Sequence, residues 1–133
     1  ASTVYELTDY GRGLKNVIRE LALWGAQSIG PPTEEDELYP GWLENALDTV
    51  VAPVAPPGRF EFRVDDEVAS LVDGETGPGS IDEPDVVVEG NADGIYHLFI
   101  DGRYDLVTIE GDRELLERLV EAARPAAAQQ LPV

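Results

Sequence analysis

Residues 59–72, with the sequence RFEFRVDDEVASLV, decide the fold class of this 133-residue chain. Over the first six positions, aromatic and aliphatic residues alternate with charged ones, which is the pattern of a strand with one buried face. Asp65 and Asp66 then predict a turn, and residues 67–72 predict a returning strand that pairs with the first as a hairpin. A sheet with one apolar face is therefore expected here.

The residues after the hairpin predict further strands and two helices. Residues 73–84 are rich in glycine and acidic residues and allow one short strand, and residues 85–89 predict a short apolar strand. A helix at 91–100, a strand at 106–109 and a final helix at 112–124 follow. This order predicts an α+β fold, in which an antiparallel or mixed sheet of about five strands is covered by helices on one face.

Capping residues mark the ends of the expected helices. Thr8 and Asn91 are suited to accept hydrogen bonds from free amides in a first turn, and Gly111 followed by Asp112 marks the start of the last helix. Gly102 is expected to end the helix that Asn91 begins, and Pro125 to end the last one.

Two more helices are expected upstream of the hairpin, at residues 9–27 and 42–51. Along the first, large apolar residues recur at spacings of four and three, which defines a heptad seam. The seam consists of Tyr10, Leu14, Val17, Leu21 and Trp24. The chain's own core could bury this edge, or the same helix of a second subunit could do so. We expect the second arrangement, a homodimer through the first helix.

The charge of the chain limits its partners. It carries 27 acidic and nine basic residues, for a formal net charge of −18. Such a charge repels phosphate backbones, so the chain alone is not expected to bind DNA or RNA. Residues 1–30 hold three acids and three bases, which places the whole net charge in residues 31–133. The first thirty residues are therefore expected to have a separate role.

The composition also excludes several classes of protein. Cysteine is absent and there is one histidine, which excludes a disulfide scaffold, a thiolate metal site and a polyhistidine centre within one chain. No apolar run is long enough to cross a bilayer, and no stretch has the pattern of a signal peptide. We therefore expect a cytoplasmic protein that has no membrane partner.

Changes in composition divide the chain into four segments. Residues 1–30 are expected to hold the end of a strand, at residues 3–7, and the long helix. Residues 31–40 are expected to form an acidic linker, residues 41–125 the α+β domain, and residues 126–133 a flexible tail.

No group of residues in the sequence has the spacing of a catalytic or metal site. The acidic runs at 65–67 and 82–85 lack the alternating ligands of a calcium loop, so we interpret them as solvated surface. His97 could act as a base, but no serine or thiol in a nucleophile context accompanies it. We expect no enzymatic activity, no cofactor and no metal.

Eight residues near the N-terminus form a motif of their own: Tyr5, Leu7, Thr8, Gly11, Leu14, Leu21, Trp24 and Gly25. Over residues 3–28 this motif resembles the end of the wing strand and the following long helix of HxlR-type winged helix-turn-helix regulators. The resemblance implies that the helix forms the dimer. It also implies that the DNA-reading helix lies upstream of residue 1, so that DNA would be contacted only through a region missing from this chain.

The rest of the chain, residues 42–124, resembles a sterol-carrier-protein-type lipid-binding domain. The resemblance lies in residues 84–91, Gly102, residues 106–112 and Pro125. It implies an apolar cavity between the sheet and its helices. The expected lining residues are Phe60, Phe62, Leu71, Ile95, Phe99, Leu116 and Leu119.

Together the two resemblances imply the ligand-sensing and dimerising part of a transcriptional regulator, which binds an apolar small molecule or a lipid. The alternative is a stand-alone lipid or sterol carrier with no role at DNA. A third hypothesis, an accessory domain in which His97 acts on a bound substrate, has the least sequence support.

Overall fold

The computed structural model describes residues 8–33 and 38–125. Three features expected from the sequence lie partly or wholly outside these residues: the strand at 3–7, part of the acidic linker (34–37) and the tail at 126–133.

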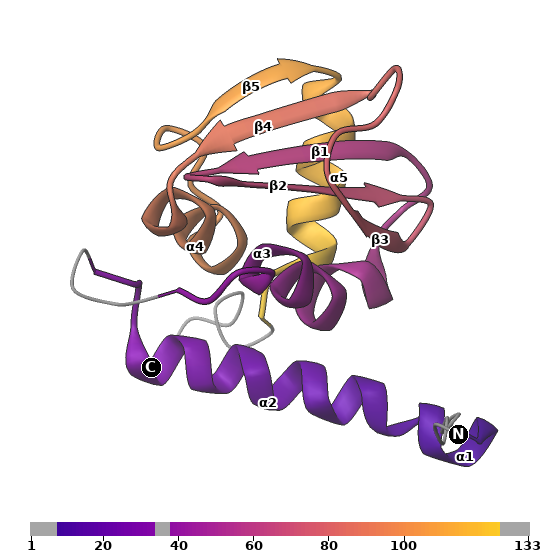
Figure 1. Ribbon diagram of the computed structural model, residues 1–133. Helices are drawn as coiled ribbons and strands as arrows, with labels where there is room; N and C mark the ends of the chain where they lie inside the picture. Colours follow the sequence, from indigo (N-terminus) through magenta and orange to yellow (C-terminus); the bar gives the residue numbers. More distant parts are fainter. Residues whose placement is uncertain (1–7, 34–37, 126–133) are drawn as a thin grey trace.

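Five strands form one mixed sheet, in the order β3-β2-β1-β4-β5. The strands are β1 (Arg59–Val64), β2 (Glu67–Val72), β3 (Glu75–Pro78), β4 (Val86–Gly90) and β5 (Thr108–Gly111). β1 and β4 are parallel, and every other neighbouring pair is antiparallel. The expected α+β class and the number of strands are confirmed (Figure 1).

The hairpin between β1 and β2 follows the alternation in its sequence. Phe60, Phe62 and Val64 are completely buried, and Phe62 pairs with Ala69 of β2. Asp65 has a φ of 54° at the turn, in the left-handed region that aspartate tolerates better than most residues. One face of the sheet is therefore apolar, as expected.

The last strand begins later than expected, at Thr108 rather than at residue 106, and it runs on to Gly111. A close approach of two strands explains this register, because a Cβ on Gly111 would lie 2.2 Å from the carbonyl oxygen of Asp85. Gly111 also has a φ of 101°, so glycine is needed there both for space and for backbone conformation. This contact sets Val86 opposite Gly111.

The two helices after the hairpin have the expected caps. The Asn91 side chain accepts from the amide of Gly94 at 2.8 Å and begins α4 (Ala92–Asp101), which ends at Gly102 in the left-handed conformation. Asp112 accepts from the amide of Leu115 at 3.1 Å and begins α5 (Arg113–Ala123).

The helix expected at 42–51 changes pitch along its length. α3 (Trp42–Ala46) continues as a π-helix, η1 (Leu47–Val51), and then as a 3₁₀ turn, η2 (Ala52–Val54). The proline within η2 explains the change, because it has no amide to donate to a carbonyl four residues earlier. The amide of Ala52 reaches back five residues instead, to the carbonyl of Leu47.

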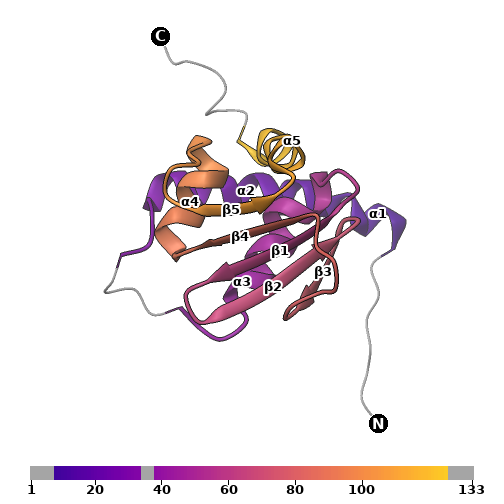
Figure 2. The same cartoon turned by 90° about the horizontal axis from the view of Figure 1, so that it is seen from above.

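Helices α3, η1, α4 and α5 contribute the apolar side chains that cover one face of the sheet and form a single core with it. Figure 2 shows α4 and α5 on one side of the strands. The long N-terminal helix is formed by α1 (Asp9–Arg12) and α2 (Leu14–Ile29), and the Thr8 hydroxyl caps α1 as expected. In Figure 1 this helix lies on the far side of α3 from the strands.

The other face of the sheet carries a buried carboxylate, Glu61, which is only 1% exposed. Its oxygens accept from the amide of Ile81 at 3.0 Å and from Arg63 Nε at 2.6 Å. Burial raises the pKa of Glu61, but the hydrogen bonds from Ile81 and Arg63 and the nearby guanidinium outweigh burial and hold this pKa below its ordinary value of 4.5.

We expect Glu61→Gln to lower the free energy of unfolding at pH 7 by about 1–3 kcal/mol, because the charged acceptor is lost. A carboxylate with a depressed pKa stabilises the fold above its unfolded-state pKa, and this contribution disappears as the pH falls through the folded-state pKa. Urea unfolding should therefore show the difference between wild type and variant shrinking below pH 4.5. Glu89→Gln, an exposed residue of the same sheet, is the control; an equal effect there would contradict the prediction.

Candidate ligand-binding cavity

An apolar cavity of about 260 Å³ lies between α2, the α3–η1 segment and α4. All of its lining residues come from these helices or from the chain between α2 and α3. They are Ala26, Pro32, Leu38, Trp42, Leu43, Ala46, Leu47, Val50, Val51, Ala92, Ile95, Tyr96, Phe99 and Ile100. We call this space the apolar cavity.

Small residues leave this space open. Ala26 of α2, Ala46 of α3 and Ala92 of α4 line the apolar cavity from three helices, and none of them reaches far enough to fill it. The sheet side of the same helices, by contrast, is packed with leucine, valine and phenylalanine side chains. The sequence predicts a cavity between the sheet and its helices. The apolar cavity lies instead among the helices, between α2 and the helices that cover the sheet.

Tyr96 is the most polar residue of the wall. Its hydroxyl donates to the carbonyl oxygen of Ala26 at 2.9 Å and so joins α4 to α2. Burial, and secondarily the charge of Asp101, raises the pKa of Tyr96. The hydroxyl therefore stays protonated at neutral pH and remains a donor to α2.

A buried arginine holds α2 against the rest of the chain. Arg19 is 7% exposed, and its Nε donates to the carbonyl oxygen of Val50 at 2.7 Å. One of its terminal nitrogens donates to the carbonyl oxygen of Ala123 at 2.8 Å, at the negative end of α5. Leu23, one turn farther along, is 1% exposed on the same side of α2. The sequence does not predict this role for Arg19, because a lone arginine in an amphipathic helix normally marks its solvent-exposed face.

The seven expected lining residues fall into two groups. Ile95 and Phe99 line the apolar cavity. The other five are completely buried in the core between sheet and helices and do not line it: Phe60, Phe62, Leu71, Leu116 and Leu119. The sequence does show the apolar side of the helix at 42–51, from Trp42 to Val51, that forms much of the wall. The sequence contains no signal that tells whether a space stays open between the sheet and the helices or between the helices themselves.

The five seam residues are all exposed. Tyr10 is 93% and Trp24 69% exposed, and the other three are between 53% and 62% exposed. At 3.6 residues per turn they lie on the side of the helix opposite Arg19 and Leu23. The chain's own core therefore does not bury the seam, and the expected partner helix stays a prediction.

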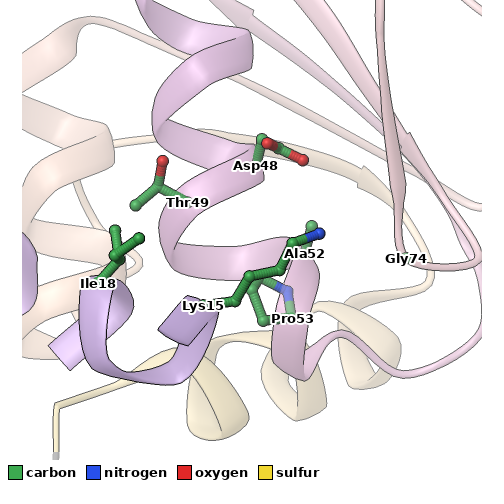
Figure 3. Close-up of a pocket in the computed structure, with 7 residues that line it drawn as sticks. All are labelled: Lys15, Ile18, Asp48, Thr49, Ala52, Pro53 and Gly74. Atoms are coloured by element: carbon green, nitrogen blue, oxygen red, sulfur yellow. The ribbon is translucent and has the colours of Figure 1, made fainter. Parts of the chain in front are cut away.

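A second hollow, of about 320 Å³, lies between α2, η1–η2 and the turn that joins β2 to β3 (Figure 3). Lys15 and Ile18 come from α2, and Asp48 and Thr49 come from η1, with Thr49 on the side of Ile18. Asp48 already accepts from the hydroxyl of Thr76 at 3.4 Å, and both Lys15 and Asp48 are exposed. This hollow has charged and polar residues in its wall and lacks the apolar wall of the first, which we take as the candidate site.

His97 lies on α4, between two carboxylates. Its Nδ1 is 2.5 Å from an oxygen of Asp101, and its Nε2 is 3.5 Å from an oxygen of Asp93. His97 lines neither the apolar cavity nor the hollow at Lys15. Among the described residues, no group of three or more histidine or acidic side chains is placed to hold a metal ion. Within residues 8–33 and 38–125, no helix is both long and apolar enough to span a bilayer.

No family model matches the chain, and no curated protein matches it. The resemblance of residues 3–28 to HxlR-type regulators therefore has no support from these comparisons.

Solved structures do match, at low sequence identity. The stereoselective inverting sec-alkylsulfatase Pisa1 from Pseudomonas sp. is similar with a TM-score of 0.51 and 14% identity, over 72% of this chain and 18% of that one. A ubiquinone synthesis protein, UbiJ-SCP2, has a TM-score of 0.47 and 15% identity, over 61% of this chain and 89% of that one. Sterol carrier protein domain 2 of Helicoverpa armigera has a TM-score of 0.44 and 12% identity, over 91% and 90%. The first of these shows that the chain shares its fold with about a fifth of a much longer enzyme, and at such identity it shows the fold alone.

Proposed function

We propose that the chain is a binding protein for a small apolar molecule, with the apolar cavity as its site. The observation that carries this proposal is a space of about 260 Å³, open on one side to solvent, whose wall is formed almost entirely by aliphatic and aromatic side chains. Ligand pockets are typically about 300–1,000 Å³, so this one suits a small ligand. If each non-hydrogen atom takes up roughly the 30 Å³ of a water molecule, the space holds on the order of ten such atoms.

The binding free energy would come from removing apolar surface from water. Trp42, Ile95 and Phe99 supply broad apolar contacts, and Tyr96 has its hydroxyl engaged with α2. At about 0.8 kcal/mol for each buried CH₂ group, we expect a ligand of about ten carbon atoms to bind with micromolar affinity at best. This mode of binding fits the sterol-carrier resemblance of residues 42–124, and it requires no catalytic step.

The binding proposal is tested by filling the cavity. In the double variant Ala26→Leu, Ala46→Leu the side chains gain six carbon atoms, or roughly 170 Å³, more than half of the space. We expect at least a ten-fold loss of affinity for 1-decanol. Binding is followed by the fluorescence of Trp42 in a Trp24→Phe background, where Trp42 is the remaining tryptophan.

Ala122→Leu, an exposed position on α5, is the matched control and should bind 1-decanol like the parent. An unchanged affinity in the double variant, with its circular dichroism spectrum intact, would show that the ligand binds elsewhere and would refute the proposal.

The seam supports a second part of the proposal, a homodimer through α1 and α2. Ile18 is 54% exposed, and together with the five seam residues it exposes roughly 700 Å² of mostly apolar surface per chain. A monomer usually leaves a smaller apolar patch in contact with water. Two copies joined by this surface would bury about 1,400 Å², within the usual range for stable complexes. Residues 1–30 have no net charge, so the pairing surface avoids the repulsion between two strongly acidic bodies.

A role as the sensing part of a transcriptional regulator is the second candidate function. One observation favours it: α2 lines the apolar cavity through Ala26 and carries the seam on its opposite side. A ligand that binds one arrangement of the dimer better than another would therefore change the dimer through a single helix. Contact with DNA is proposed only through a region upstream of residue 1.

A further inference from the structure

The wall of the apolar cavity has no cation for a negatively charged ligand. Among the described residues that line it, none is charged. Arg19 is the nearest buried guanidinium in the fold, since it bonds to the carbonyl of the lining residue Val50. All three of its nitrogens are engaged, with Val50, with Ala123 and with the carboxylate of Glu20. The Tyr96 hydroxyl is likewise committed to the carbonyl of Ala26.

The surroundings of the cavity are negative. A hollow of about 360 Å³ adjoins it and shares three of its residues, Pro32, Leu38 and Ala92. Asp65 and Asp93 lie in the wall of this second hollow, which we call the acidic hollow. In the sequence, the four residues that connect Thr33 to Leu38 are also all acidic, and the whole chain has a formal charge of −18. An anion in the acidic hollow is repelled by the carboxylates of Asp65 and Asp93 and by the net charge of the chain.

From these two observations we infer that the apolar cavity accepts an uncharged apolar molecule, such as a medium-chain alcohol or ester, and excludes the carboxylate of the same chain length. This inference rests on the proposed function. Burying a carboxylate without a cation or a hydrogen-bond donor is strongly unfavourable. The acid can still enter in its protonated form, and at pH 7.5 only about one carboxyl group in a thousand is protonated, which limits the discrimination to about a thousand-fold.

The test compares 1-decanol with sodium decanoate, which have the same number of carbon atoms. Both are titrated at pH 7.5 into the full chain carrying Trp24→Phe, and Trp42 fluorescence is confirmed by calorimetry. We expect decanol to bind between ten-fold and about a thousand-fold more tightly than decanoate. Equal or tighter binding of decanoate would overturn this inference and leave the proposed function standing. Failure of both ligands to bind would instead refute the proposed function.

A charge variant tests the contribution of the acidic hollow. Asp65→Asn with Asp93→Asn keeps side-chain oxygens that can accept hydrogen bonds, including the one from the amide of Ala92 to Asp65. We expect it to raise the affinity for decanoate several-fold and to leave that for decanol unchanged. Asp82→Asn with Glu83→Gln removes the same charge from outside the two spaces and should change neither affinity. Equal effects of the two pairs would show that Asp65 and Asp93 do not exclude the anion.

Discussion

Replacing Arg19 with methionine should lower the free energy of unfolding by about 3 kcal/mol. The guanidinium makes charge-assisted hydrogen bonds to the carbonyl oxygens of Val50 and Ala123, at 2.7 and 2.8 Å. Each such bond to a charged group contributes about 1.5–3 kcal/mol, and methionine would leave both carbonyls without their donor. Methionine keeps a similar length and apolar stem, so the loss reflects hydrogen bonding more than packing.

Urea denaturation followed by far-ultraviolet circular dichroism measures this change, and amide hydrogen exchange shows where it arises. We expect faster exchange along α2 at conditions where the sheet remains protected, because Arg19 joins α2 to η1 and α5. Arg12→Met is the matched control, since Arg12 is exposed and pairs with an exposed aspartate one turn away. If both variants unfold at the same urea concentration as the wild type, Arg19 does not hold α2 in place.

The double variant Leu14→Asp, Leu21→Asp should convert a dimer into a monomer. Both leucines are more than half exposed in the single chain, so the change should leave the fold of the monomer intact. In a pair of chains it would place four carboxylates in the apolar interface, and we expect the dissociation constant to rise at least a thousand-fold. Analytical ultracentrifugation between micromolar and submillimolar concentrations measures this constant.

The control for the dimer carries the same added charge away from the seam. Asn16→Asp with Gln27→Asp changes two exposed polar residues of α2 that lie outside the seam, and this variant should remain dimeric. A wild-type chain that sediments as a monomer at the highest concentration would refute the homodimer. Repeating the experiment with 1-decanol tests the sensing role, since a ligand that favours one arrangement must shift the dissociation constant.

Local sequence patterns predicted most of the secondary structure because they depend on neighbouring residues. The alternation in residues 59–64 gave the buried face of β1, and Asn91 and Asp112 cap helices within three residues of their own positions. The register of β5 could not be predicted in this way, because the close contact of Gly111 with Asp85 depends on a segment more than twenty residues away in the sequence.

The sequence predicts an apolar cavity, but it places this cavity between the sheet and the helices rather than among the helices. An apolar space near Ile95 and Phe99 was expected, and these residues do line the cavity. Phe60 and Leu116 were expected beside them and instead fill the core. The same apolar residue types fill a core and line an apolar cavity. A hydrophobic pattern therefore cannot tell core residues from cavity residues.

The sequence by itself determined that this chain forms an α+β sheet with one apolar face, and that its first helix carries a continuous apolar seam. Both follow from the spacing of apolar residues, which local backbone geometry converts directly into faces. Only the tertiary structure decided where space remains open and which side of α2 is covered. Three alanines from three different helices meet at the cavity, and Arg19 turns its side of α2 inward by bonding to carbonyls about 30 and 100 residues away in the chain.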